Sequence, residues 1–117
     1  MRVGFIGGVN SSFCTLQKLV EHNLDVVGVF GYKPSKHMIV SGYNDFEGFC
    51  SGNDIAYYPF TKINEHVELI KELNLDVLFV VGISQLISDD IIGAPKLGCI
   101  GYHPTLLPKG RGRAPIA

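Results

Sequence analysis

Short apolar runs alternate along this chain with segments in which apolar side chains recur every three or four positions. Uninterrupted apolar runs are typical of buried β-strands, and the three-to-four-residue spacing is typical of a helix with one buried face. The runs predict strands at residues 3–6, 26–30, 55–60, 77–81 and 99–102. The helical spacing predicts helices at residues 10–23 and 64–73, with shorter ones at 45–50 and 88–92.

The first predicted helix shows its spacing most clearly. Phe13, Leu16 and Leu19 fall on one stripe of such a helix, which is therefore expected to be its buried face. Asn10 or Ser11 is expected to cap its amino end, because both side chains can accept a hydrogen bond from a free backbone N–H.

Alternating strands and helices predict a parallel sheet with right-handed crossovers, hence a doubly wound, Rossmann-like α/β fold in one domain spanning residues 1–117. The run at 77–81, Val-Leu-Phe-Val-Val, predicts a central strand covered on both faces. Such sheets bind ligands beyond the carboxyl ends of their strands. The segments 7–12, 82–86 and 103–116 follow strands, so the site is expected there.

Composition and charge narrow the possible functions. The chain has 117 residues, of which 46% are hydrophobic, and its formal net charge of -1 provides no overall field that would attract nucleic acid or an anionic membrane. Its three cysteines form no CxxC pair, so neither a zinc site nor a disulfide framework is predicted, and we expect a cytoplasmic protein. No apolar run is long enough to predict a membrane span or signal peptide.

The segment 103–116 is chemically the richest of the chain. It places the imidazole of His103 after a predicted strand, where it could hydrogen-bond a developing oxyanion or move a proton. Pro104 and Pro108 would reduce the entropy that is lost when the loop is ordered. The alternative is that His103 is an ordinary strand-end histidine and that Leu106 and Leu107 simply fill the core.

This segment resembles the signature of the folate-dependent formyltransferases, Asn-x-His-x-Ser-Leu-Leu-Pro-x-x-Arg-Gly, followed shortly by Pro-Ile. The match puts His103 on the signature histidine, Thr105 on the serine and Arg111 on the arginine. Gly101 stands where the family has a catalytic asparagine, and the family's catalytic aspartate would lie beyond Ala117. The resemblance therefore implies the amino-terminal part of a formyltransferase fold, incomplete at its carboxyl end.

The resemblance also implies a co-substrate and a set of contacts. The co-substrate would be 10-formyltetrahydrofolate, whose formyl group passes to a primary amine while His103 stabilises the oxyanion; His103, Thr105 and Gly101 would be the catalytic positions. The pterin would lie mainly against backbone groups of one loop, which consists of Gly82, Ile83, Ser84, Gln85 and Leu86. Leu106 and Arg111 would lie at the edge of the folate site. Ile83 and Leu86 could instead be ordinary core residues. No metal ion is expected.

Several readings of the acceptor and of the activity stay open. The sequence Lys109-Gly-Arg-Gly-Arg favours a nucleotide-linked amino sugar as the acceptor, with methionyl-tRNA and glycinamide ribonucleotide as alternatives. In the loop predicted at 31–44, Lys33, Lys36 and His37 could meet a phosphate or could simply be solvated. A non-catalytic domain that binds folate or a partner is a further alternative. A nicotinamide dehydrogenase is disfavoured, because the glycines after the first strand do not form GxGxxG.

Overall fold

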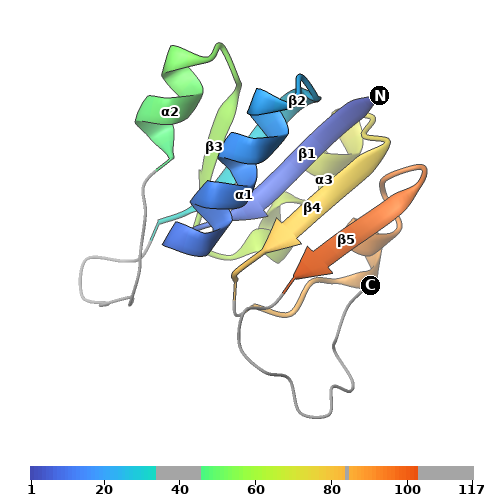
Figure 1. The fold of residues 1–117 in the computed structure, drawn as a ribbon. Helices are drawn as coiled ribbons and strands as arrows, with labels where there is room; N and C mark the ends of the chain where they lie inside the picture. The colour runs from blue at the N-terminus through green and yellow to red at the C-terminus, as the bar shows by residue number, and fades with distance from the viewer. Residues whose placement is uncertain (34–45, 84, 103–117) are drawn as a thin grey trace.

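A computed structural model describes residues 1–33, 46–83 and 85–102, and these residues form one twisted sheet flanked by helices (Figure 1). All neighbouring strands are parallel, in the order β3-β2-β1-β4-β5. The strands are β1 (Arg2–Gly7), β2 (Asp25–Tyr32), β3 (Tyr57–Phe60), β4 (Val77–Val81) and β5 (Gly98–Tyr102). The predicted α/β fold with a parallel sheet is confirmed.

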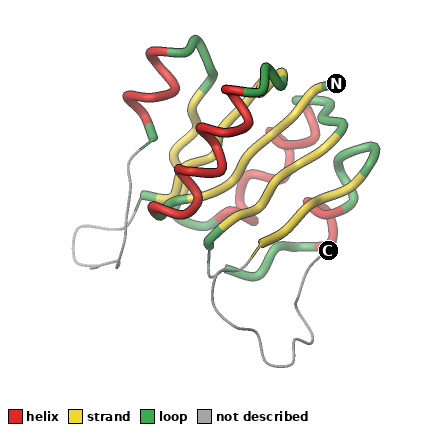
Figure 2. Tube along the Cα trace, in the orientation of Figure 1, coloured by secondary structure: helices red, strands yellow, loops and turns green. Residues whose placement is uncertain are grey.

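Helices cover both faces of this sheet (Figure 2). They are α1 (Asn10–Glu21), α2 (Glu47–Gly52), the short 3-10 helix η1 (Ile63–His66), α3 (Val67–Glu72) and α4 (Asp89–Ile92). One apolar cluster joins α1 and α2 to the sheet, and a second joins α3 and α4 to its other face. This division follows from right-handed crossovers, because connections that run toward β3 and connections that run toward β5 must pass over opposite faces.

Element ends differ from the predictions by up to two residues, and three of the differences have a clear local description. The residue that precedes α1 is Val9, in an extended conformation and with no side-chain cap, so neither Asn10 nor Ser11 caps this helix. The helix predicted at 64–73 is divided into η1 and α3, because His66 has non-helical angles (φ -110°, ψ 22°). The second strand continues through Tyr32, so the predicted loop begins later than expected; residues 34–45 of that loop lie outside the described residues.

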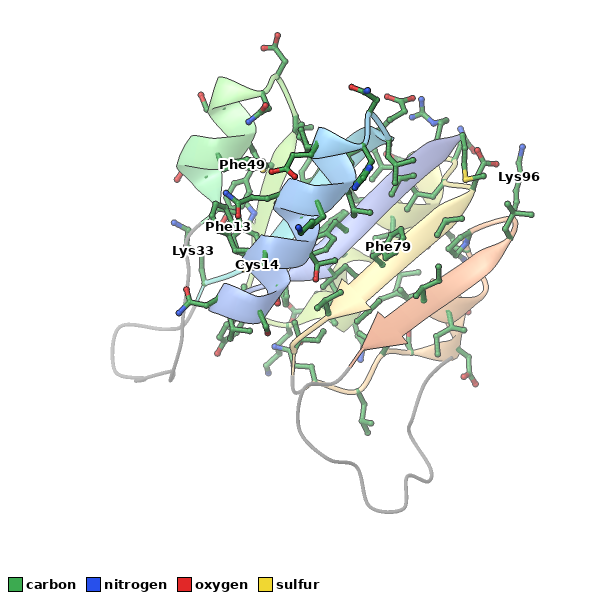
Figure 3. The ribbon with its side chains drawn as sticks, viewed as in Figure 1. Phe13, Cys14, Lys33, Phe49, Phe79 and Lys96 are labelled. Carbon is green, nitrogen blue, oxygen red and sulfur yellow. The ribbon has the colours of Figure 1, made fainter. Side chains whose placement is uncertain are left out.

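The most deeply buried strand is β1, whose alternating side chains enter both clusters: Val3 and Phe5 on the α1 side and Ile6 on the α3 side. Strand β4 is an interior strand paired with β1 and β5, as its apolar run predicts. It is not fully covered on both faces, since Phe79 is half-buried and lies beside α1 rather than beneath it (Figure 3). The α1 crossover leads toward β3, so no helix among the described residues covers the β4–β5 side of this face, where Ile100 is 49% exposed.

Candidate functional site

Strands β1, β4 and β5 end side by side at the carboxyl edge of the sheet. Val80 pairs with Ile6 on one side, and Val81 pairs with Tyr102 on the other. The segment after β4 therefore starts between the β1–α1 turn and the end of β5 (Figure 1). This arrangement brings together the segments 7–12 and 82–86, where the sequence predicts a ligand site; the third predicted segment, 103–116, lies outside the described residues.

The end of β4 is fixed against the start of α1 by a buried contact. Ser12 is fully buried, and its hydroxyl donates a hydrogen bond of 2.5 Å to the backbone oxygen of Val81. The next residue, Gly82, has a left-handed φ of +70°, and a Cβ there would lie 2.5 Å from Oγ of Ser12 and 2.8 Å from Cγ2 of Val9. Only glycine satisfies both this conformation and this close approach.

The two glycines after β1 also pack closely against the protein itself. A Cβ on Gly7 would lie 2.6 Å from Cβ of Ser12, and a Cβ on Gly8 would lie 2.6 Å from Cβ of Tyr32. In a dinucleotide fold, the glycines of this turn let the backbone approach a pyrophosphate. Here close packing within the protein accounts for both glycines.

Two side-chain amides join the segment after β4 to the segment after β3. Nε2 of Gln85 donates to the backbone oxygen of Thr61 at 2.6 Å, and Oε1 of Gln85 accepts from the N–H of Ile63 at 2.8 Å. In return, Nδ2 of Asn64 donates to the backbone oxygen of Leu86 at 3.0 Å, and its Oδ1 accepts from the N–H of Ser88 at 2.9 Å. Each amide thus uses a donor and an acceptor on the backbone of the opposite segment.

The two apolar residues of the predicted pterin loop differ in their surroundings. Ile83 is half-buried and packs against the α3-side cluster, so for Ile83 the alternative of a core residue holds in part. Leu86 is 72% exposed and is not a core residue.

Several predicted site residues cannot be placed in this arrangement. Ser84, His103, Thr105, Leu106 and Arg111 lie outside the described residues, as do Lys36 and His37. Gly101 lies in β5, is half-buried and pairs with Val80. It therefore reaches the expected edge, but it brings no side chain to it.

Two further polar residues have contacts within the protein. Lys33, which could meet a phosphate or could simply be solvated, lies with its Nζ 3.8 Å from a carboxylate oxygen of Glu47 (Figure 3). Burial raises the pKa of the Cys99 thiol to about 11, and its Sγ lies near the backbone oxygens of Ile91 and Ile92. In the part of the chain that the structure describes, no cluster of three potential metal ligands occurs and no helix is long and apolar enough to cross a membrane.

The sequence does not predict the role of two residues whose side chains hydrogen-bond at this edge. Ser12 lies within the helical pattern with nothing to distinguish it, and its partner Val81 lies 69 residues further along the chain. Asn64 was assigned only to the start of a helix, whereas its side chain reaches residues 22 and 24 positions further along the chain. The one available signal was that asparagine near a helix start usually bonds to backbone groups.

Comparisons with known proteins show the family to which this chain belongs. The family model described as formyl transferase matches residues 14–117. The chain is 36% identical over 120 residues to the methionyl-tRNA formyltransferase of Clostridioides difficile (strain 630), covering 99% of this chain and 39% of that protein.

Two further relatives carry the same name. The chain is 36% identical over 121 residues to the methionyl-tRNA formyltransferase of Lachnospira eligens, covering 99% of this chain and 38% of that protein. It is 33% identical over 123 residues to that of Ehrlichia ruminantium (strain Welgevonden), covering 99% and 40%. The chain thus spans about two fifths of the length of the curated relatives it matches.

Proposed function

Because this chain belongs to the formyl transferase family, we propose that the full-length protein transfers a formyl group from 10-formyltetrahydrofolate to the amine of methionyl-tRNA. The observation that carries the choice of acceptor is the shared name of the relatives, all matched over 99% of this chain. This shared name favours methionyl-tRNA over the nucleotide-linked amino sugar that the motif Lys109-Gly-Arg-Gly-Arg suggests.

In this proposal, the backbone of residues 82–86 holds the pterin at the carboxyl edge of the sheet. Leu86 supplies an exposed apolar surface, and Gly82 lets the segment turn directly after β4. The side-chain amide of Gln85 bonds to the neighbouring segment through both its oxygen and its nitrogen, so recognition through backbone groups fits better than recognition through this side chain. Leu106 and Arg111 would complete the edge of the folate site.

The transfer forms one carbon–nitrogen bond, breaks another, and moves one proton from the acceptor amine to N10. The neutral acceptor amine attacks the formyl carbon, His103 stabilises the resulting oxyanion by a hydrogen bond, and the bond between that carbon and N10 then breaks. A carboxylate beyond Ala117 would take the proton that the attacking amine loses, and a proton must reach N10 as it leaves, so that the products are a formamide and tetrahydrofolate. Removing one oxyanion donor typically lowers the rate by about a hundred- to a thousandfold, so Gly101 in place of asparagine requires another donor or a slower enzyme.

The charge of the chain bears on where a tRNA would bind. Ten Lys and Arg residues against eleven Asp and Glu residues give a formal net charge of -1, so the chain as a whole has no excess of positive charge to attract the phosphates of a tRNA. We therefore expect the main tRNA-binding surface to lie in the remaining three fifths of the protein, as judged from the length of the relatives.

The test is a transfer assay on the full-length protein with labelled 10-formyltetrahydrofolate and two acceptors in parallel, methionyl-tRNA and a nucleotide-linked amino sugar. Label in the tRNA supports the proposal, whereas label only in the sugar would contradict the choice of acceptor. A calorimetric titration with a stable 10-formyl folate analogue separates the non-catalytic alternative, which predicts binding without transfer to either acceptor.

A further inference from the structure

The four hydrogen bonds made by Asn64 and Gln85 connect two segments that the sheet leaves independent. Residues 61–64 follow β3 and residues 85–88 precede α4, and in the sheet β3 is separated from β4 by β2 and β1. No strand pairing therefore fixes one segment against the other. Gln85 bonds to the backbone on both sides of Lys62, and Asn64 bonds to the backbone on both sides of Ile87.

The reciprocity of these bonds makes them a clamp. Each amide offers its donor and its acceptor to backbone groups two residues apart, so each one restrains both the distance and the orientation of the opposite segment. Ile63, which is fully buried, and the partly buried Ile83 and Ile87 pack in the same apolar cluster beneath the clamp. The apolar contacts hold the segments together, and the amides set their register.

Such a restraint matters most where a ligand is bound by backbone groups. The segment from 82 to 88 contains no helix or strand among its described residues, so its own hydrogen-bond ladder does not fix it. Recognition by a loop requires the contacting atoms to be held within about 0.5 Å, which residues behind the loop must provide.

We propose that Asn64 and Gln85 are positioning residues that hold residues 85–88, which include the end of the predicted pterin loop, in the conformation that binds the pterin of 10-formyltetrahydrofolate. This inference rests on the proposed function for the identity of the ligand. Neither residue needs to touch the folate or the reacting atoms.

The test uses the full-length protein and the variants Asn64→Ala and Gln85→Ala. Each variant loses two hydrogen bonds. We expect KM for 10-formyltetrahydrofolate, and Kd for its stable analogue, to rise by about fivefold or more. A rise of about fivefold corresponds to the combined net contribution of two weak hydrogen bonds. Both kcat and KM for the acceptor should stay within about twofold, since neither residue acts on the reacting atoms.

Asn53→Ala is the matched control. Its Nδ2 donates to the backbone oxygen of Phe49 at 2.8 Å at the end of α2, so this variant also removes an exposed asparagine that bonds to backbone. We expect its folate KM to stay within about twofold of the wild-type value. An equal rise in Asn53→Ala would contradict the inference, because it would show a general effect of destabilisation.

A second variant separates the two halves of the Asn64 bond pair. Asn64→Asp keeps an acceptor for the N–H of Ser88 and loses the donor to Leu86, so its folate KM should lie between the values of wild type and Asn64→Ala. Amide hydrogen exchange gives a readout that needs no ligand: Asn64→Ala should lose protection at Ser88 and Gln85→Ala at Ile63, while amides of β1 stay protected.

The outcomes distinguish this inference from the proposed function. If the wild-type protein binds the folate analogue and both clamp variants bind it equally well, the positioning role is wrong and the proposed function stands. If the wild-type protein binds no folate analogue, the proposed function fails and the positioning role fails with it. A fall in kcat with unchanged folate KM would also overturn the positioning role.

Discussion

Replacing Gly82 with alanine adds one carbon atom, and so tests how closely the backbone after β4 packs against the start of α1. The new Cβ would sit in a left-handed backbone conformation, at φ +70°, and 2.5 Å from Oγ of Ser12. The conformation costs an L-residue about 1 to 2 kcal/mol. The close approach forces Ser12 to move, and the loss of its buried hydrogen bond to Val81 costs about 1 to 3 kcal/mol more. We therefore expect Gly82→Ala to lower the free energy of unfolding by about 2 to 5 kcal/mol.

Two other glycines separate the conformational cost from the steric cost. Gly98 also has a positive φ, at +118°, but a Cβ there would meet nothing within 4 Å, so Gly98→Ala should cost about 1 to 3 kcal/mol from the backbone conformation alone. Gly48 lies in α2 with open space around it, so Gly48→Ala should be neutral or stabilising by about 0.5 to 1 kcal/mol.

Urea unfolding of the three variants, monitored by circular dichroism, measures the change in the free energy of unfolding for each variant relative to the wild-type protein. A double variant with Ser12→Ala provides an internal check, because removing Oγ relieves the contact, and the combined loss should fall short of the sum of the single losses by about 1 kcal/mol. If Gly82→Ala is no more destabilising than Gly98→Ala, the close contact between Gly82 and Ser12 is not as described.

Two further predictions concern the core and the cysteines. Phe46 is fully buried, with ring centroids of Phe5 and Phe13 at 6.2 and 5.6 Å, so Phe46→Ala should cost about 3 to 5 kcal/mol in urea unfolding; a loss below 1 kcal/mol would contradict this packing. Because burial raises the pKa of Cys99 from 9.0 to about 11, alkylation of Cys99 should keep accelerating up to about pH 11. Exposed Cys14 should react first at pH 8 in a mass-spectrometric time course; equal rates at pH 8 would show that Cys99 is not desolvated.

Much of the fold could be predicted because its signals are local. The runs that contain Val3, Phe5 and Val77 are apolar enough to identify β1 and β4, and Leu16 marks the buried stripe of α1. The incomplete cover of β4 could not be predicted from its own residues. It depends on the direction in which the α1 crossover leaves β1, which is a property of the whole sheet.

The details of the candidate site depend on contacts between distant residues. Asn10 has the residue type of a cap, yet the chain enters α1 through Val9, and Ser12 bonds to Val81 instead. The sequence predicts that the backbone of Gln85 contacts the folate, whereas in the structure its side chain hydrogen-bonds to the backbone of Thr61 and Ile63. Local preferences describe where such side chains can bond, but only the packed sheet decides which backbone groups come within reach.

The measurement that tests the central claim most directly is single-turnover formyl transfer from 10-formyltetrahydrofolate to methionyl-tRNA by the full-length protein and by its His103→Ala variant. The account predicts transfer by the wild-type protein and a rate lower by about a hundredfold or more in the variant, which should still bind a stable folate analogue. An unchanged rate in His103→Ala would refute the role of this imidazole, and a wild-type protein that transfers no formyl group would contradict the proposed function itself.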